Sequence, residues 1–145
     1  MESPAPDQVF RLRGAAVSSA DLLAIADFSA NPDEATYTSL SVRCTDRQCL
    51  SVGVDSDGTL SILEITGAGQ RTLTSAGVSI AARHLNRMIL EVNRQRVRVW
   101  FNGRAVGPEE TATAATPGYS EVFVLSRRRG PAAVRLALFQ TFESR

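Results

Sequence analysis

The chain has 145 residues, 43% of them hydrophobic and 21% charged, and its formal net charge at pH 7 is +1. This length suits one domain, which can bury a sizeable core without a metal or a disulfide framework. The near-zero charge excludes the strongly basic surface that captures nucleic acid, and no run of 18 apolar residues exists that could span a membrane.

The start of the chain differs in composition from the rest. Residues 1–8 are rich in proline and polar side chains and predict a linker-like segment, followed by one domain over residues 9–145. The segment has no charged stretch followed by an apolar one, so we expect no secretion signal there. A linker at this place favours a domain taken from a longer parent protein, with a naturally short chain as the alternative.

Apolar and polar side chains then alternate in many short stretches, which predicts β-strands with one buried face. The stretches are 10–14, 40–44, 50–54, 59–62, 88–92, 96–101 and 133–138. Residues 19–28 fit either a strand or a helix capped by Ser19, and we favour the strand because the neighbouring segments are strands. Residues 79–83 are a candidate for a short helix.

Turn signals separate these stretches. Asp57-Gly58 and Asn102-Gly103 each follow an alternating run, and both pairs tolerate the positive φ that tight hairpins require. Residues 93–95 fit a short hairpin loop, and residues 112–118 and 130–131 read as loops. About ten short strands joined in this way predict an all-β fold, a two-sheet antiparallel β-sandwich of the jelly-roll type.

From Tyr37 onward the chain resembles the concanavalin A-like jelly rolls, the broad laminin G and lectin/glucanase group. The likeness lies in the order of hairpins, in which a strand ending in Asp-Gly precedes an Asn-led apolar strand and then a strand ending in Asn-Gly. The stretches that carry it are 40–44, 51–58, 85–92 and 97–103, with 138–142 as the closing strand. The resemblance implies a small domain of an exported bacterial multidomain protein, located outside the cell or at its surface.

The same resemblance offers an enzyme class, and the residues argue against it. Glucanases of this group carry paired acids in a Glu-x-Asp-x-x-Glu strand, and no such triplet occurs here. Glu64 and Glu91 lie far apart in sequence, each without an acidic partner two residues away, whereas a retaining glycosidase needs two carboxyl groups about 5–5.5 Å apart. We therefore expect no enzyme and no cofactor.

Metal ligands are equally sparse. His84 is the only histidine, which excludes a histidine-rich metal site. Asp55 and Asp57 resemble calcium ligands, but an EF-hand loop starting at Asp55 would need glutamate where Thr66 stands. A plain hairpin turn explains both aspartates better, so the sequence predicts no metal site.

Cys44 and Cys49 flank a four-residue stretch and are candidates for a disulfide, which would suit an exported protein. Cys44 is in step with Leu40 and Val42, whereas Cys49 is out of step with Leu50. Because facing residues of an antiparallel pair point to the same side, the bond needs a bulge or a distorted loop end.

The chain's most informative surface candidate is an aromatic residue flanked by arginines. If Val97, Val99 and Phe101 face the core, then the opposite face of the same strand holds Arg96, Arg98 and Trp100. An indole beside guanidinium groups can stack on a sugar ring or bind a carboxylate. The alternative is that a loop covers this face and Trp100 packs beneath it.

A second positive feature, the run 127–129 of three arginines, either contacts an acidic partner or is simply solvated.

The sequence thus predicts a non-catalytic binding module that recognises glycan or cell-wall carbohydrate, with Trp100, Arg98 and Arg96 as ligand-binding residues. The first alternative is a protein-interaction or assembly domain of a larger exported or membrane-anchored protein. The second is a carbohydrate-active enzyme. The expected partner is a glycan or a protein, and the sequence indicates no particular oligomeric state.

Overall fold

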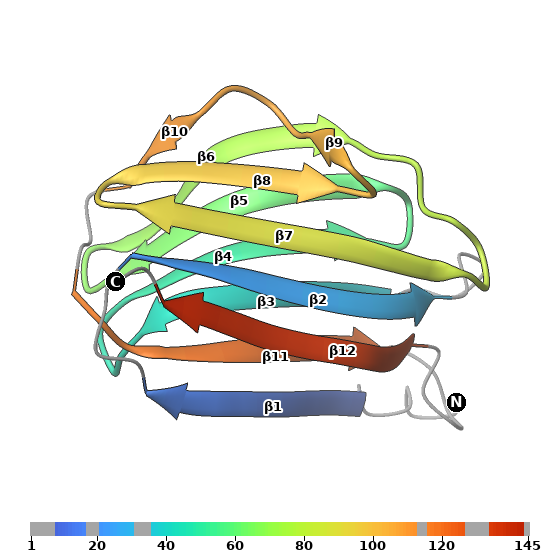
Figure 1. Ribbon diagram of the computed structural model, residues 1–145, viewed down its shortest axis with the longest axis horizontal. Coiled ribbons are helices and arrows are strands. Elements are labelled where there is room, and N and C mark those ends of the chain that lie inside the picture. Colours follow the sequence, from blue (N-terminus) through green and yellow to red (C-terminus); the bar gives the residue numbers. More distant parts are fainter. Residues whose placement is uncertain (1–7, 17–20, 31–35, 113–115, 127–133, 144–145) are drawn as a thin grey trace, which may run out of the picture.

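The computed structural model describes residues 8–16, 21–30, 36–112, 116–126 and 134–143, and these residues form two facing β-sheets (Figure 1). The strands are β1 (Gln8–Ala16), β2 (Leu22–Ala30), β3 (Thr36–Cys44), β4 (Cys49–Asp55), β5 (Thr59–Thr66), β6 (Gly69–Gly77), β7 (Leu85–Asn93), β8 (Arg96–Phe101), β9 (Arg104–Ala105), β10 (Glu110–Thr111), β11 (Tyr119–Ser126) and β12 (Val134–Glu143). None of the described residues is helical, and accordingly none of them belongs to a helix that could cross a membrane.

The strands divide into two layers of antiparallel pairs. The back sheet has the order β1-β11-β3-β4-β5-β6, and the front sheet has the order β10-β8-β7-β2-β12, with β9 paired to β8 (Figure 1). The predicted two-sheet antiparallel β-sandwich is therefore confirmed. On one side of the molecule the back sheet ends in β6, and the front sheet ends in β9 and β10 (Figure 1).

The alternating pattern becomes the core between these layers. In β8, Val97, Val99 and Phe101 are at most 3% exposed, while Arg96 and Arg98 lie on the outer surface. Burial alternates in the same way in β5 and β7, whereas β3 and β4 are buried at almost every position, and all four strands supply core side chains. The largest fully buried apolar residues are Phe28, Leu40, Leu60, Ile62, Met88 and Leu90. Burial of such side chains contributes roughly 1.5–3 kcal/mol each, which is why the period-two pattern decides the fold.

Two ambiguous segments are resolved. Residues 22–30 form a strand, β2, which pairs with β7 and β12 in the middle of the front sheet, so the strand interpretation is confirmed. The helix considered over residues 79–83 is wrong, because this stretch is a loop and turn between β6 and β7. Asn86 holds that loop, since its side chain accepts a hydrogen bond from the Ala81 amide and donates one to the Ala81 carbonyl.

The predicted hairpins are confirmed by their backbone angles. Asn102 and Gly103 have φ values of 49° and 80°, which fits a two-residue turn between β8 and β9. Gly58 has a φ of 88° between β4 and β5, and Arg94 has a φ of 55° between β7 and β8. The predicted loop at 130–131 and the arginine run 127–129 lie outside the described residues, as does the linker-like segment apart from Gln8, which begins β1.

Cys44 and Cys49 form a disulfide, with their Cα atoms 4.2 Å apart. The bulge or distortion that this bond was predicted to need lies at Arg43. The φ of Arg43 is 53°, and the pairing of β3 with β11 changes register at this residue. A bulge of this kind adds one residue to β3 and reverses the side to which the next side chain points. Cys44 thereby reaches Cys49 at the start of β4.

Candidate functional site

The residues predicted to bind ligand share the outer face of β8 in the front sheet. Their neighbours Val97, Val99 and Phe101 point into the core, so Arg96, Arg98 and Trp100 point away from it. The Arg96 and Arg98 side chains are 74% and 55% exposed, and Trp100 is half-buried. The structure therefore brings these three side chains to one surface, with part of the indole accessible.

Glu109, which the sequence did not single out, joins this surface from the segment before β10. Its Oε2 atom lies 2.7 Å from Nε of Arg98, and its Oε1 atom lies 3.6 Å from Nε of Arg96. The same residues, with Glu91 and Asn93, line a hollow of about 120 Å³. Donors and acceptors thus stand side by side, and both arginines have the Glu109 carboxylate as a partner.

The register of the front sheet extends this face with apolar side chains. Ile89 of β7 lies opposite Trp100, and Ile25 of β2 lies opposite Ile89. The next row pairs Leu23 with Phe142 of β12, and the Phe142 side chain is 50% exposed. Trp100 therefore stands at one end of an apolar row that crosses three strands.

The acidic residues weighed for catalysis lie in different sheets. Glu64 belongs to β5 in the back sheet, is 2% exposed, and pairs with Arg71 at 2.9 Å. Glu91 belongs to β7 in the front sheet and lines the hollow beside Arg98. The two carboxylates therefore have different roles. Glu64 is a buried partner of the more exposed Arg71, and Glu91 is a hydrogen-bond acceptor at the outer surface.

The residues weighed for metal binding have local backbone roles. Oδ1 of Asp57 accepts a hydrogen bond from the amide of Thr59, and the carbonyl of Asp55 accepts one from the amide of Gly58. The carbonyl of His84 accepts a hydrogen bond from Asn86. Among the described residues no three histidine, cysteine or acidic side chains gather as a metal site would require.

A second outer face, on the back sheet, also carries aromatic residues. Tyr37 of β3 and Phe123 of β11 make an edge contact with their ring centroids 6.4 Å apart, and Arg11 of β1 lies 5.2 Å above the Phe123 ring. Ser41 donates a hydrogen bond to Ser51 on the small-residue floor beside them. The sequence did not single out this group, although Tyr37, Ser39 and Ser41 alternate with Thr38, Leu40 and Val42, because the group depends on the pairing of β3 with the distant β11.

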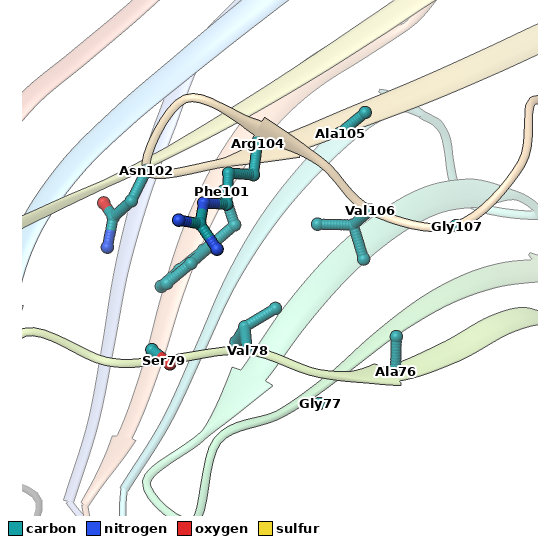
Figure 2. Close-up of a pocket in the computed structure, with 10 residues that line it drawn as sticks. All are labelled: Ala76, Gly77, Val78, Ser79, Phe101, Asn102, Arg104, Ala105, Val106 and Gly107. Carbon is teal, nitrogen blue, oxygen red and sulfur yellow. The ribbon is translucent and has the colours of Figure 1, made fainter.

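The largest hollow that we describe lies at the edge of the sandwich (Figure 2). It has a volume of about 400 Å³ and lies between the end of β6 with the residues after it and the β8–β9 hairpin with the residues that follow. The lining residues are Ala76, Gly77, Val78, Ser79, Phe101, Asn102, Arg104, Ala105, Val106 and Gly107. Volumes of this size are typical of small-molecule sites.

The chain matches no protein-family model and no curated protein sequence. It is similar in structure to the carbohydrate-binding module CBM66 from Bacillus subtilis, with a TM-score of 0.75 and 13% identity over 96% of this chain and 84% of that one. It is also similar to sheep galectin-11 in complex with glycerol, with a TM-score of 0.68 and 6% identity over 92% and 96% of the two chains.

A third similar structure is a toad ovary galectin in complex with thio-digalactose, with a TM-score of 0.67 and 8% identity over 92% of this chain and 98% of that one. Each comparison covers nearly the whole of the present chain at low sequence identity. The chain therefore has the jelly-roll β-sandwich fold that carbohydrate-binding modules and galectins share.

Proposed function

We propose that this protein is a non-catalytic carbohydrate-binding module that recognises glycan or cell-wall carbohydrate through the outer face of β8. The observation that carries the proposal is an accessible indole, Trp100, on one sheet face with the cluster of Arg96, Arg98 and Glu109. The fold supports it, because one similar structure is a carbohydrate-binding module and another holds thio-digalactose.

The chemistry of this face suits a neutral sugar. The indole plane offers an apolar surface to the C–H face of a pyranose ring. Arg96 and Arg98 donate hydrogen bonds to hydroxyl groups, and Glu91 and Glu109 accept them. Because Glu109 already pairs with both guanidinium groups, an anionic ligand would have to displace a carboxylate that is in place.

We further propose that the domain works outside the cell or at its surface, as part of a larger bacterial protein. The Cys44–Cys49 disulfide supports this location, since such bonds persist in oxidising compartments. The same proposal includes membership of the concanavalin A-like lectin/glucanase group, which the hairpin order supports. The separation of Glu64 and Glu91 into different sheets supports the non-catalytic assignment.

The test is binding of neutral oligosaccharides and cell-wall polysaccharides, measured on an array and then by calorimetry. We expect Trp100→Ala to weaken binding by about 30-fold, the effect of removing a central aromatic contact. Phe123→Ala is the matched control, because it removes a half-buried aromatic ring from the opposite outer face. Binding lost in Phe123→Ala and kept in Trp100→Ala would overturn the assignment of the face, and no binding to any glycan would overturn the function.

A second candidate function, protein interaction, is favoured by the apolar row of Trp100, Ile89 and Ile25, together with the exposed Phe142 of the neighbouring row. Contiguous apolar surface on a sheet face marks protein interfaces more often than it marks bare surface. If this face binds a protein, Phe142→Glu will abolish the association while leaving glycan binding at Trp100 intact. Sedimentation with and without a candidate partner measures the first effect, and calorimetry measures the second.

A further inference from the structure

The hollow at the edge of the sandwich lies where the two sheets separate, next to the part of the edge at which β6 and β10 hold them together. Where β6 and β10 face each other, Thr74 donates a 2.6 Å hydrogen bond to Glu110, and Arg71 donates one to the carbonyl of Thr111. Gly107 marks the limit of this closed part, since a Cβ added there would lie 2.9 Å from Cγ2 of Thr74. Beyond it, the β8–β9 hairpin and the chain after β6 diverge and leave the 400 Å³ space, which we call the edge cleft (Figure 2).

Core side chains close the bottom of the edge cleft. Phe101 and Val106 are 3% and 7% exposed, and Val78 packs against the core from the other wall. The loop that carries Val78 is fixed in place, because the amide of Val78 donates a 2.7 Å hydrogen bond to the carbonyl of Gly58. The cleft is therefore a formed depression with an apolar floor.

Its rim offers hydrogen-bonding groups of the main chain. In the tight β8–β9 hairpin, Phe101 and Arg104 face each other next to the turn, and Trp100 and Ala105 form the next pair. Hydrogen-bonded and non-hydrogen-bonded pairs alternate along an antiparallel ladder, and the pair of Trp100 and Ala105 is a non-hydrogen-bonded one. The amide and carbonyl of Ala105 therefore point away from β8. These groups are available to hydroxyls of a bound molecule.

The charge of the edge cleft comes from Arg104. None of the lining residues is acidic, and Arg104 makes no ion pair with a described residue. By contrast, Arg87 is paired with Asp27, and Arg96 and Arg98 share Glu109 in the same sheet. Figure 2 shows the Arg104 side chain directed from the hairpin into the cleft. An exposed guanidinium over an apolar floor is suited to a single planar anion.

We propose that the edge cleft is a second binding site, for a monosaccharide unit that carries one carboxylate, such as a uronic acid residue of a glycan. Arg104 binds the carboxylate through two parallel hydrogen bonds, the main chain at Ala105 bonds the ring hydroxyls, and Val78 and Val106 contact the apolar face of the ring. This inference rests on the proposed function for its choice of a sugar, and it uses a surface separate from that of Trp100. The β8 face thus selects neutral units and the cleft selects acidic ones.

The test is a titration of the ¹⁵N-labelled protein with sodium glucuronate, its methyl ester and glucose. Glucuronate will shift the amide signals of Asn102, Ala105, Gly107 and Gly77, and the neutral ester and glucose, followed at the same four amides, will bind at least about tenfold more weakly. Arg104→Gln will weaken glucuronate binding by roughly 10- to 100-fold, the range for a hydrogen-bonded charge pair. Arg47→Gln, which neutralises an exposed arginine in the β3–β4 loop, will leave it unchanged.

The two proposals fail separately. Equal binding of glucose and glucuronate at the amides of the edge cleft, glucuronate shifts only outside the cleft, no glucuronate binding, or an unchanged affinity in a folded Arg104→Gln variant would each overturn the second site. Trp100→Ala must leave glucuronate binding intact while it weakens binding of neutral glycans by about 30-fold. Loss of both ligands in Trp100→Ala would show one shared site and would equally overturn the inference. Arg104→Lys, which keeps the charge and loses the planar fork, will retain an intermediate affinity.

Discussion

The guanidinium of Arg43, in the back sheet, donates a 2.5 Å hydrogen bond to the carbonyl oxygen of Arg94, in the β7–β8 turn of the front sheet. The Arg43 side chain is 1% exposed and also lies 3.6 Å from the carboxylate of Asp21. Burial lowers the pKa of Arg43, while the carboxylates of Asp21 and Glu64 oppose that shift. The guanidinium therefore links the two sheets at one end of the core. Arg43 directly precedes the disulfide residue Cys44 in β3.

Replacing this buried cation should destabilise the fold. Arg43→Met will lower the free energy of unfolding by roughly 2–4 kcal/mol, because the Arg94 carbonyl loses its hydrogen bond and nearby carboxylates lose a buried partner. Arg43→Lys will cost less, since it keeps the charge. Guanidinium unfolding measures both, with Arg47→Met as the exposed control. A change below about 0.5 kcal/mol in Arg43→Met, the usual surface range, would contradict the structural role.

The turn at Gly58 should not accept a side chain. Its φ is 88°, and a Cβ there would lie 2.6 Å from the carbonyl oxygen of Val78. We expect Gly58→Ala to cost about 2 kcal/mol or more, from the left-handed conformation and from displacement of the Val78 loop. Gly67→Ala is the control, because no atom lies within 4 Å of its Cβ position. Thermal unfolding compares the two, and equal midpoints would refute the expectation.

Reduction of the disulfide should weaken the domain without unfolding it. The bond closes a short loop, with a sequence separation of 5. Chain entropy for so small a loop gives a stabilisation of about 2 kcal/mol. Unfolding with and without a reducing agent will show this difference in the wild type, whereas a Cys44→Ala/Cys49→Ala variant will be indifferent to the reductant. A reductant effect that persists in the double variant would have another source.

Alkaline pH should destabilise the protein through Tyr37. Burial raises the pKa of the Tyr37 phenol, and the Asp55 carboxylate raises this pKa further. The native state then holds a proton that the unfolded chain has already released, so the stabilisation is complete below the unfolded-state pKa of about 10 and is lost as the pH rises above it. Melting temperatures at pH 8 and 10.5 measure the loss. Tyr37→Phe will reduce it, and an unchanged loss in Tyr37→Phe would contradict the role of this phenol.

Glu109 should matter for glycan binding because it orients two arginines. Glu109→Gln removes the carboxylate that lies 2.7 Å from Arg98 and 3.6 Å from Arg96, so both side chains gain freedom that a ligand must then restrict. We expect a several-fold loss of affinity for a neutral glycan, on the order of 1 kcal/mol. Glu121→Gln is the control, because it makes the same change beside Arg13 on the opposite outer face and should leave glycan affinity unchanged. Equal effects of the two substitutions would argue against a role for Glu109 at the site.

The local pattern predicted much of this protein, and the reason is geometric. In β8, alternation alone places Arg96, Arg98 and Trp100 on the face opposite Val97, Val99 and Phe101, because successive side chains of a strand point to opposite sides. The turns at Asp57-Gly58 and Asn102-Gly103 were equally predictable, since their backbone angles depend on the residues within the turn. Such features need only neighbours in sequence.

What the sequence determined by itself was therefore the strands, the tight turns and the side of β8 on which Trp100 lies. Only the tertiary structure decided that Glu109 meets both arginines, that Arg43 turns inward to reach Arg94, and that the edge cleft opens beside Arg104. Each of these depends on register and packing between strands that are remote in the chain. A local side-chain pattern decides which face of a strand is buried, but it does not decide which remote strand lies beside it, because the free energy that selects that pairing arises only once the two sheets pack together.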